Sequence, residues 1–136
     1  MRFMILVKAS QDAEAGKMRS PDMLTAMGTF NEALSNAGLL LAGEGLHASA
    51  QGKRVTFAGE KRTVIDGPFV ETKVLIAGCW LWQCASMAEA LVWARRIPFQ
   101  EGEIEMRQVL EAADFGPECT PELQAQEERL RAQGTH

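Results

Sequence analysis

One histidine and one aspartate are the residues of this chain whose types best suit acid–base chemistry. His47 carries the side chain whose ordinary pKa lies nearest neutrality, and Asp66 opens the turn-like stretch Asp66-Gly67-Pro68-Phe69. A carboxylate within hydrogen-bond reach of an imidazole orients the ring and fixes its tautomer, as a general base requires. The pair therefore predicts proton transfer on a small molecule. An aspartate before Gly-Pro also commonly bonds its own backbone to order a turn, and this alternative remains open.

Four further residues could line a pocket beside that pair. Arg107 alternates with apolar residues in an expected strand, so it points to the face opposite the helices, where it would suit an anionic small molecule. An internal salt bridge with Glu105, on the same face, explains it equally well. Glu71 and Lys73 share one face as pocket walls or as a solvated pair. Phe69 is either a substrate platform or a core residue.

The cysteines and glycines favour no metal and no nucleotide cofactor. Cys79 and Cys84 stand five apart on one expected strand and face opposite sides, so they cannot share a metal ion. Cys119 lies in a loop. The sequence contains no Gly-rich phosphate loop after a strand and no nucleophile elbow. An odd number of cysteines, three, argues against a secreted disulfide scaffold and for a reducing cytoplasm.

Length and charge exclude several classes of protein. The chain has 136 residues, 46% of them hydrophobic and 24% charged, which is the size and composition of one globular domain. A net charge of −4 gives no reason to expect a nucleic-acid partner. The apolar run near the N-terminus is too short for a signal peptide or a membrane span. We expect a cytoplasmic protein without a membrane partner.

Hydrophobic periodicity and capping residues outline the secondary structure. Ser20-Pro21 is typical of a helix start, Ser86-Met87-Ala88-Glu89 is a capping box, and segment 10–19 is expected to be a loop. The expected strands are 2–9, 39–42, 53–57, 63–65, 74–84 and 103–110, and the expected helices are 20–37, 86–97 and 120–133. Strands 53–57 and 63–65 are expected to form a hairpin.

The order of these elements predicts an α+β fold. It is the ferredoxin-like βαββαβ unit with an inserted β-hairpin and a C-terminal helix, divided into a domain at 1–115 and a helical extension at 116–136. Strands 2–9 and 74–84 are apolar on both faces, so both faces should be covered. The chain has too few elements for that, which predicts that the second face meets its own copy in a symmetric homodimer.

The stretch Asp66 to Lys73, followed by Ile76-Ala77-Gly78, resembles the signature of the DGPF proteins, a branch of the YciI-related (YCII) family. The likeness continues to about residue 115. It takes in the opening strand, Gly45-Leu46-His47, the helix end at 93–98, and 103–107. Two positions depart from the family pattern. Val74 replaces a usual glutamate, which removes a carboxylate from any polar cluster, and Ala48 stands where proline is frequent.

The resemblance implies a dimeric α+β barrel. Many members are encoded near sigma factors of the extracytoplasmic type, and a His–Asp pair has been proposed as the active site in the wider YciI branch. Two functions therefore remain open. The first is a small enzyme in which His47 and Asp66, aided by Arg107, transfer protons on a small molecule. The second is a non-catalytic ligand-binding or regulatory module that docks a partner such as a sigma factor.

Overall fold

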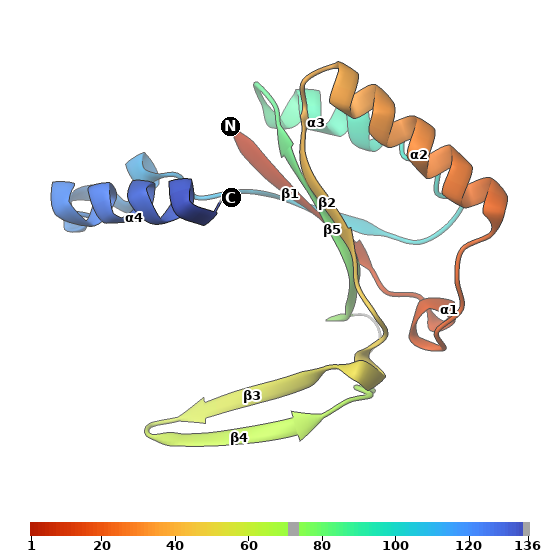
Figure 1. The fold of residues 1–136 in the computed structure, drawn as a ribbon, viewed down its shortest axis with the longest axis horizontal. Helices are drawn as coiled ribbons and strands as arrows, with labels where there is room; N and C mark the ends of the chain where they lie inside the picture. Colours follow the sequence, from red (N-terminus) through yellow and green to blue (C-terminus); the bar gives the residue numbers. More distant parts are fainter. Residues whose placement is uncertain (71–73, 135–136) are drawn as a thin grey trace.

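The computed structural model, which describes residues 1–70 and 74–134, is built on a four-stranded antiparallel sheet (Figure 1). Its strands are β1 (Arg2–Lys8), β2 (Leu40–Gly45), β5 (Ile76–Gln83) and β6 (Ile104–Gln108). They lie in the order β2-β5-β1-β6, and each neighbouring pair is antiparallel. The expected α+β class is therefore confirmed, and the arrangement is compatible with the ferredoxin-like unit.

Two helices cover one face of this sheet, as Figure 1 shows: α2 (Pro21–Asn36) and α3 (Met87–Ala94). Both begin at the serine that the sequence indicates. Ser20 Oγ accepts a hydrogen bond from the Met23 amide at 3.2 Å, and Ser86 Oγ accepts one from the Glu89 amide at 3.1 Å. These caps satisfy amide groups that the first helical turn would otherwise leave unpaired.

Three short helical segments were not predicted. The expected loop at 10–19 contains α1 (Gln11–Glu14), a single turn whose N-cap is Ser10. Two 3₁₀ segments, η1 (Ser49–Gln51) and η3 (Ala112–Glu118), lie outside the expected helices and strands. The prediction of a loop at 10–19 was wrong because one capped turn is too short to produce a hydrophobic period.

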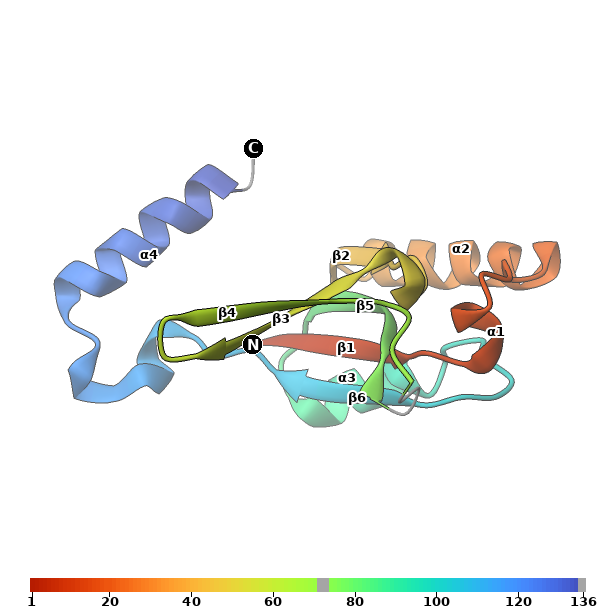
Figure 2. The same cartoon turned by 90° about the horizontal axis from the view of Figure 1, so that it is seen from below.

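A β-hairpin forms a second, separate sheet. Strands β3 (Lys53–Ala58) and β4 (Lys61–Asp66) pair antiparallel, and every residue in both strands is exposed. Figure 1 shows the hairpin projecting on the side of the main sheet away from α2 and α3. Figure 2, turned by 90°, shows it lying in front of the main sheet. The expected hairpin is confirmed.

The C-terminal helix α4 (Pro121–Gly134) extends from the body and buries no residue within the described chain (Figure 1). One ion-pair cluster ties it to the sheet. Arg2 Nε lies 2.8 Å from Glu111 Oε1, and Arg131 lies 3.5 Å from the other oxygen of the same carboxylate. The hydrogen bond from Arg2 lowers the pKa of the Glu111 carboxyl and raises the pKa of the Arg2 guanidinium. Glu111 therefore stays ionised at neutral pH and links α4 to β1.

The core lies between the sheet and the two covering helices. Its largest fully buried side chains are Trp82, Phe3, Ile5 and Leu34. The prediction that Trp80 and Trp82 share a face is confirmed, because both are buried there. Ile76, expected on that same face, is 38% exposed, since the register between β1 and β5 shifts at Val7 and Lys8. A period-2 pattern holds only where the ladder is regular.

The two buried tryptophans differ in one hydrogen bond, which gives a testable contrast. Trp80 Nε1 donates to Asn31 Oδ1 at 2.9 Å, whereas Trp82 Nε1 is buried with no partner in the described structure. We expect Trp80→Phe to cost about 1 kcal/mol more unfolding free energy than Trp82→Phe, because only the first removes a made hydrogen bond. Urea denaturation of both variants measures the difference. An equal or larger cost for Trp82→Phe contradicts this account.

Candidate functional site

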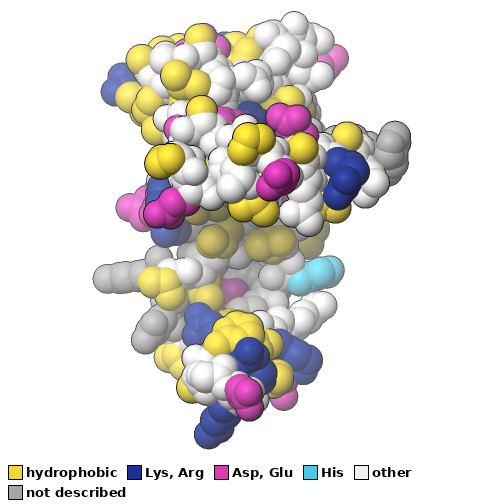
Figure 3. Space-filling model, turned by 90° about the vertical axis from the view of Figure 1, so that its left-hand side faces the viewer, with side chains coloured by type: hydrophobic (Ala, Val, Ile, Leu, Met, Phe, Trp, Pro, Cys, Tyr) yellow, Lys and Arg dark blue, Asp and Glu magenta, His cyan; other side chains and the backbone are white. Residues whose placement is uncertain are grey.

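Within the described residues, the second face of the main sheet has no covering element, and the expectation that a second copy covers it stays a prediction. Met4 and Leu6 of β1 stand opposite Leu81 and Cys79 of β5, on the side away from the core. Met4 is exposed, and the other three are partly exposed. We call these four residues, with the charged residues of β6 beside them, the uncovered face. Figure 3 looks from this side and shows hydrophobic side chains at the back of a hollow above the hairpin.

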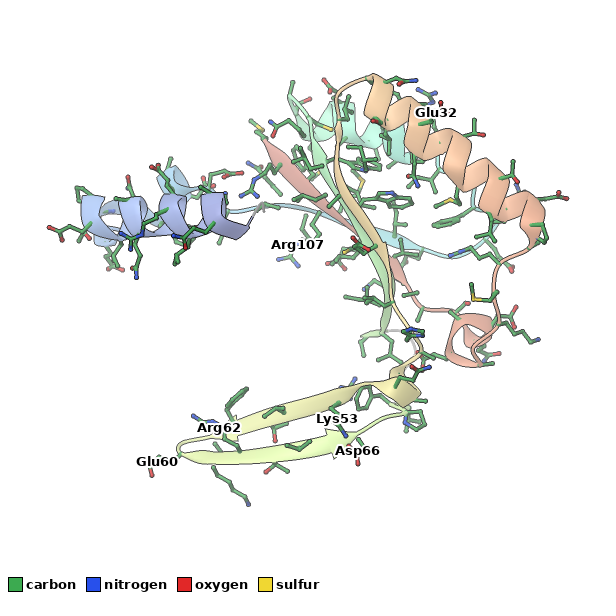
Figure 4. All side chains as sticks on the ribbon, in the orientation of Figure 1. Glu32, Lys53, Glu60, Arg62, Asp66 and Arg107 are labelled. Atoms are coloured by element: carbon green, nitrogen blue, oxygen red, sulfur yellow. The ribbon has the colours of Figure 1, made fainter. Side chains whose placement is uncertain are left out.

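Three charged side chains border the apolar part of the uncovered face. Arg107 stands opposite Met4 in the β1–β6 ladder, and Figure 4 shows it projecting away from α2. Its guanidinium lies 3.3 Å from Glu105, which also lies 3.4 Å from Lys8. The hydrogen bond from Arg107 and the attraction of Lys8 hold the pKa of the Glu105 carboxyl below its ordinary value. Glu105 thus partly neutralises two cations, and the expected internal salt bridge is present.

The Arg107 side chain remains 72% exposed despite that ion pair. A guanidinium presents five N–H donors in a planar fork, and one contact with Glu105 leaves most of them free for a ligand. The uncovered face therefore combines an apolar floor with an accessible cation at its β6 side.

Asp66 pairs with Lys53 at the base of the hairpin. Lys53 Nζ lies 2.5 Å from Asp66 Oδ1, and the two residues are directly opposite in the β3–β4 ladder (Figure 4). The partner that the structure shows for Asp66 is this cross-strand lysine, and the bond of Asp66 to its own turn backbone stays an open alternative. Both side chains are largely exposed, so this pair contributes little to stability.

His47 lies just beyond β2. The backbone before it is held to β5, since the Leu46 amide donates to the Ala77 carbonyl at 2.8 Å. The His47 side chain is exposed and makes no hydrogen bond or ion pair with the described part of the chain. The Asp66 carboxylate pairs with Lys53, and among residues 1–70 and 74–134 no carboxylate pairs with the His47 imidazole. The catalytic roles of His47 and Asp66 stay predictions.

The Asp-Gly-Pro-Phe stretch instead joins the base of the hairpin to the body through hydrogen bonds that involve Ser49. We call this set of hydrogen bonds the clamp. The Phe69 amide donates to Ser49 Oγ at 3.0 Å, and Ser49 Oγ donates to the Glu14 carboxylate at 2.5 Å. The Ser49 amide donates to the other oxygen of Glu14 at 3.0 Å. The Gly67 amide donates to the Gly52 carbonyl at 3.0 Å. Three segments that are distant in sequence, at Glu14, at 49–52 and at 67–69, therefore meet at one turn.

Sequence reasoning missed Glu14 and Ser49, although one local signal was available. Ser10 followed by the acidic residues of α1 is typical of a helix start. No local pattern links residue 14 with residue 49, since their contact spans 35 positions. The remaining candidates divide in two. Phe69 is partly buried and stacks under the Arg54 guanidinium at 4.0 Å, outside the core cluster. Glu71 and Lys73 lie outside the described residues.

Among the described residues, no three or more His, Cys, Asp or Glu side chains lie close enough together to hold a metal ion. Cys79, Cys84 and Cys119 are all free thiols. Burial raises the pKa of the Cys84 thiol, so this cysteine is chemically quiet at neutral pH. In residues 1–70 and 74–134, no helix has the length and apolar character needed to cross a membrane.

These features describe an α+β protein with one covered and one uncovered sheet face. A family model described as the YCII-related domain matches residues 1–113. The match covers most of the chain, so the chain belongs to the YCII-related family, as its motif indicated. The finer assignment to the DGPF branch stays a prediction. A search of the curated proteins finds no match.

The tight packing at the clamp predicts that a methyl group added at Gly67 lowers the stability of the protein. A Cβ on Gly67 would lie 1.7 Å from the Ser49 carbonyl oxygen, so the backbone must move. We expect Gly67→Ala to lower the unfolding free energy by about 1–3 kcal/mol, as overpacking does, and to speed amide exchange in the hairpin.

Gly28 provides the matched control for this prediction. It lies inside α2, and a Cβ there would meet nothing within 4 Å. Gly28→Ala should raise the unfolding free energy by about 0.5–1 kcal/mol, because alanine favours the helix. Urea denaturation at equal protein concentration compares the two variants. A neutral Gly67→Ala would show that the clamp does not hold the hairpin.

Proposed function

We propose that this protein acts as a homodimer in which the uncovered faces of two copies meet and form a dimeric α+β barrel. The exposed area supports this. One chain exposes 9916 Å², whereas a compact monomer of 14.9 kDa exposes about 7,000 Å². The excess is about 2,900 Å² per chain, or about 5,800 Å² for two chains, which reaches the upper end of the total area that permanent homodimers bury.

The hairpin supports the same proposal. Its apolar side chains are left open: Val55 is 46%, Phe57 70%, Val64 60% and Ile65 45% exposed. An isolated two-stranded hairpin is marginally stable in water, so this one needs a covering surface. Its own main sheet provides none in the described structure, and a second copy presents an apolar face of matching kind.

We propose that the space between the two faces binds a small anionic molecule. The single observation that carries this function is Arg107, a largely exposed guanidinium at the edge of an apolar floor. We favour this binding role over the acid–base enzyme, because Asp66 pairs with Lys53 and no carboxylate of the described residues pairs with His47. A reducing cytoplasm is the compartment that the three free thiols favour.

The homodimer is tested by placing a charge on the uncovered face. Size-exclusion chromatography with light scattering should give the wild type a mass twice 14.9 kDa. We expect Leu81→Lys to shift the protein towards the monomer, because a buried unpaired ammonium is costly at an interface. Leu24→Lys, on an exposed position of α2, is the control and should remain dimeric. A wild type that is monomeric at micromolar concentration overturns the proposal.

The anion site is tested by two substitutions with opposite expected effects. Arg107→Gln removes the cation, and Glu105→Gln removes the carboxylate that competes with a ligand for it. In a thermal-shift screen of carboxylates and phosphate esters, compounds that stabilise the wild type should lose affinity for Arg107→Gln by about tenfold or more. The same compounds should bind Glu105→Gln more tightly.

Two controls accompany the anion test. Arg129→Gln, on exposed α4, should leave ligand affinity unchanged. His47→Ala should also leave it unchanged, and catalytic turnover of a bound compound that disappears in His47→Ala would favour the enzyme instead. Equal thermal shifts in Arg107→Gln and the wild type would contradict the assignment of Arg107.

A further inference from the structure

A second cavity lies on the other side of the sheet, away from the uncovered face. It measures about 200 Å³ and is lined by residues of α2, β2 and β5, together with Arg19 and Phe99. Trp80 and Val7, which point into the core side of the sheet, contribute to its wall. His47, Asp66 and Arg107 do not line it, and Cys79 is the one residue of the four-residue apolar part of the uncovered face that borders both places. It is therefore a separate place from the proposed anion site.

One part of the cavity wall is aromatic. Trp80 and Phe99 both line it, and their rings lie 6.3 Å apart with an interplanar angle of 37°. Met27, a flexible side chain that adapts to ligand shape, adds to the wall. An apolar cavity of about 150 Å³ is large enough for benzene, so this volume suits a single aromatic ring with a small substituent.

Two polar side chains line the same cavity. The Arg19 guanidinium lies 4.3 Å above the Phe99 ring, which holds it at the cavity. No carboxylate in the described chain lies within ion-pair distance of Arg19. Asn31 Oδ1 accepts from Trp80 Nε1 at 2.9 Å, which fixes the orientation of the amide. The Asn31 NH₂ group is then the part left to donate to a ligand.

The acidic residue near the cavity does not compete for the arginine. Glu44 lines the cavity, but it is paired with Cys79 in the β2–β5 ladder, on the face opposite Trp80. The Glu44 carbonyl oxygen also lies close to Gly78, where a Cβ would approach it to 2.8 Å. Glu44 therefore contributes its backbone to the cavity wall and not its carboxylate. The charged side chain that faces the cavity is Arg19, so the cavity is positively charged.

We infer that this cavity binds a small carboxylate with a flat apolar body, such as an aromatic monocarboxylate. The ring lies among Trp80, Phe99 and Met27, and the carboxylate accepts a bidentate pair of hydrogen bonds from Arg19. The Asn31 NH₂ group adds a further donor. Planar recognition of a carboxylate is the interaction that the guanidinium fork suits best. This inference does not depend on the proposed dimer or on Arg107.

Isothermal titration calorimetry with benzoate and benzamide tests the inference. The two probes share shape, and only benzoate is charged at neutral pH. We expect benzoate to bind the wild type about tenfold or more tightly than benzamide. Arg19→Gln should abolish that preference, while Arg19→Lys should restore part of it, because lysine keeps the charge but loses the fork. Arg19 is exposed, so these variants should fold.

Control variants separate this site from the uncovered face. Arg129→Gln, Arg107→Gln and Leu81→Lys should each retain benzoate binding, because none of these residues lines the cavity. Absence of benzoate binding to the wild type overturns the inference. So does benzoate affinity that is unchanged in Arg19→Gln, or that is lost in Arg107→Gln, since the probe would then occupy the uncovered face. None of these outcomes bears on the mass measurement that tests the dimer.

Discussion

A sheet with two apolar faces and helices on only one of them is the constraint on which the rest of this structure depends. Burial of apolar surface is the main driving force of folding, and α2 and α3 supply it for the face that carries Trp80 and Trp82. The opposite face, with Met4 and Leu81, keeps its apolar side chains open in the single chain. The roles that we propose for the hairpin, Arg107 and Glu105 all depend on this difference between the two faces.

Much of the fold could be predicted because its signals are local. Ser20 and Ser86 mark the starts of α2 and α3, and the alternation in β6 places Arg107 away from the core. The exception at Ile76 has a physical cause, since the shift in register between β1 and β5 interrupts the alternation. Local patterns thus predict helices and strands well. They predict poorly where the pairing of two strands changes register.

The candidate site was harder to predict because proximity between distant segments leaves no local trace. His47 and Asp66 were grouped by chemical type, but the carboxylate of Asp66 is taken by the lysine opposite it in the hairpin. Ser49, which accepts a hydrogen bond from the Asp-Gly-Pro-Phe stretch, and Glu14, which accepts from Ser49, carry no motif of their own. The turn is specific in sequence for a steric reason, since the Ser49 carbonyl leaves no room for a side chain at Gly67.

The aromatic cluster of the core has an optical consequence. The ring centroid of Phe30 lies 6.0 Å from that of Trp80, 6.2 Å from that of Trp82 and 6.5 Å from that of Trp93. All three tryptophans of the chain therefore border the same phenylalanine. The rings of Trp80 and Trp82 are themselves 5.9 Å apart, close enough for their excited states to couple. Indole emission and near-ultraviolet dichroism therefore report on a single region, the contact between α2, α3 and β5. The hairpin and α4, which contain no tryptophan, contribute nothing to the indole signal.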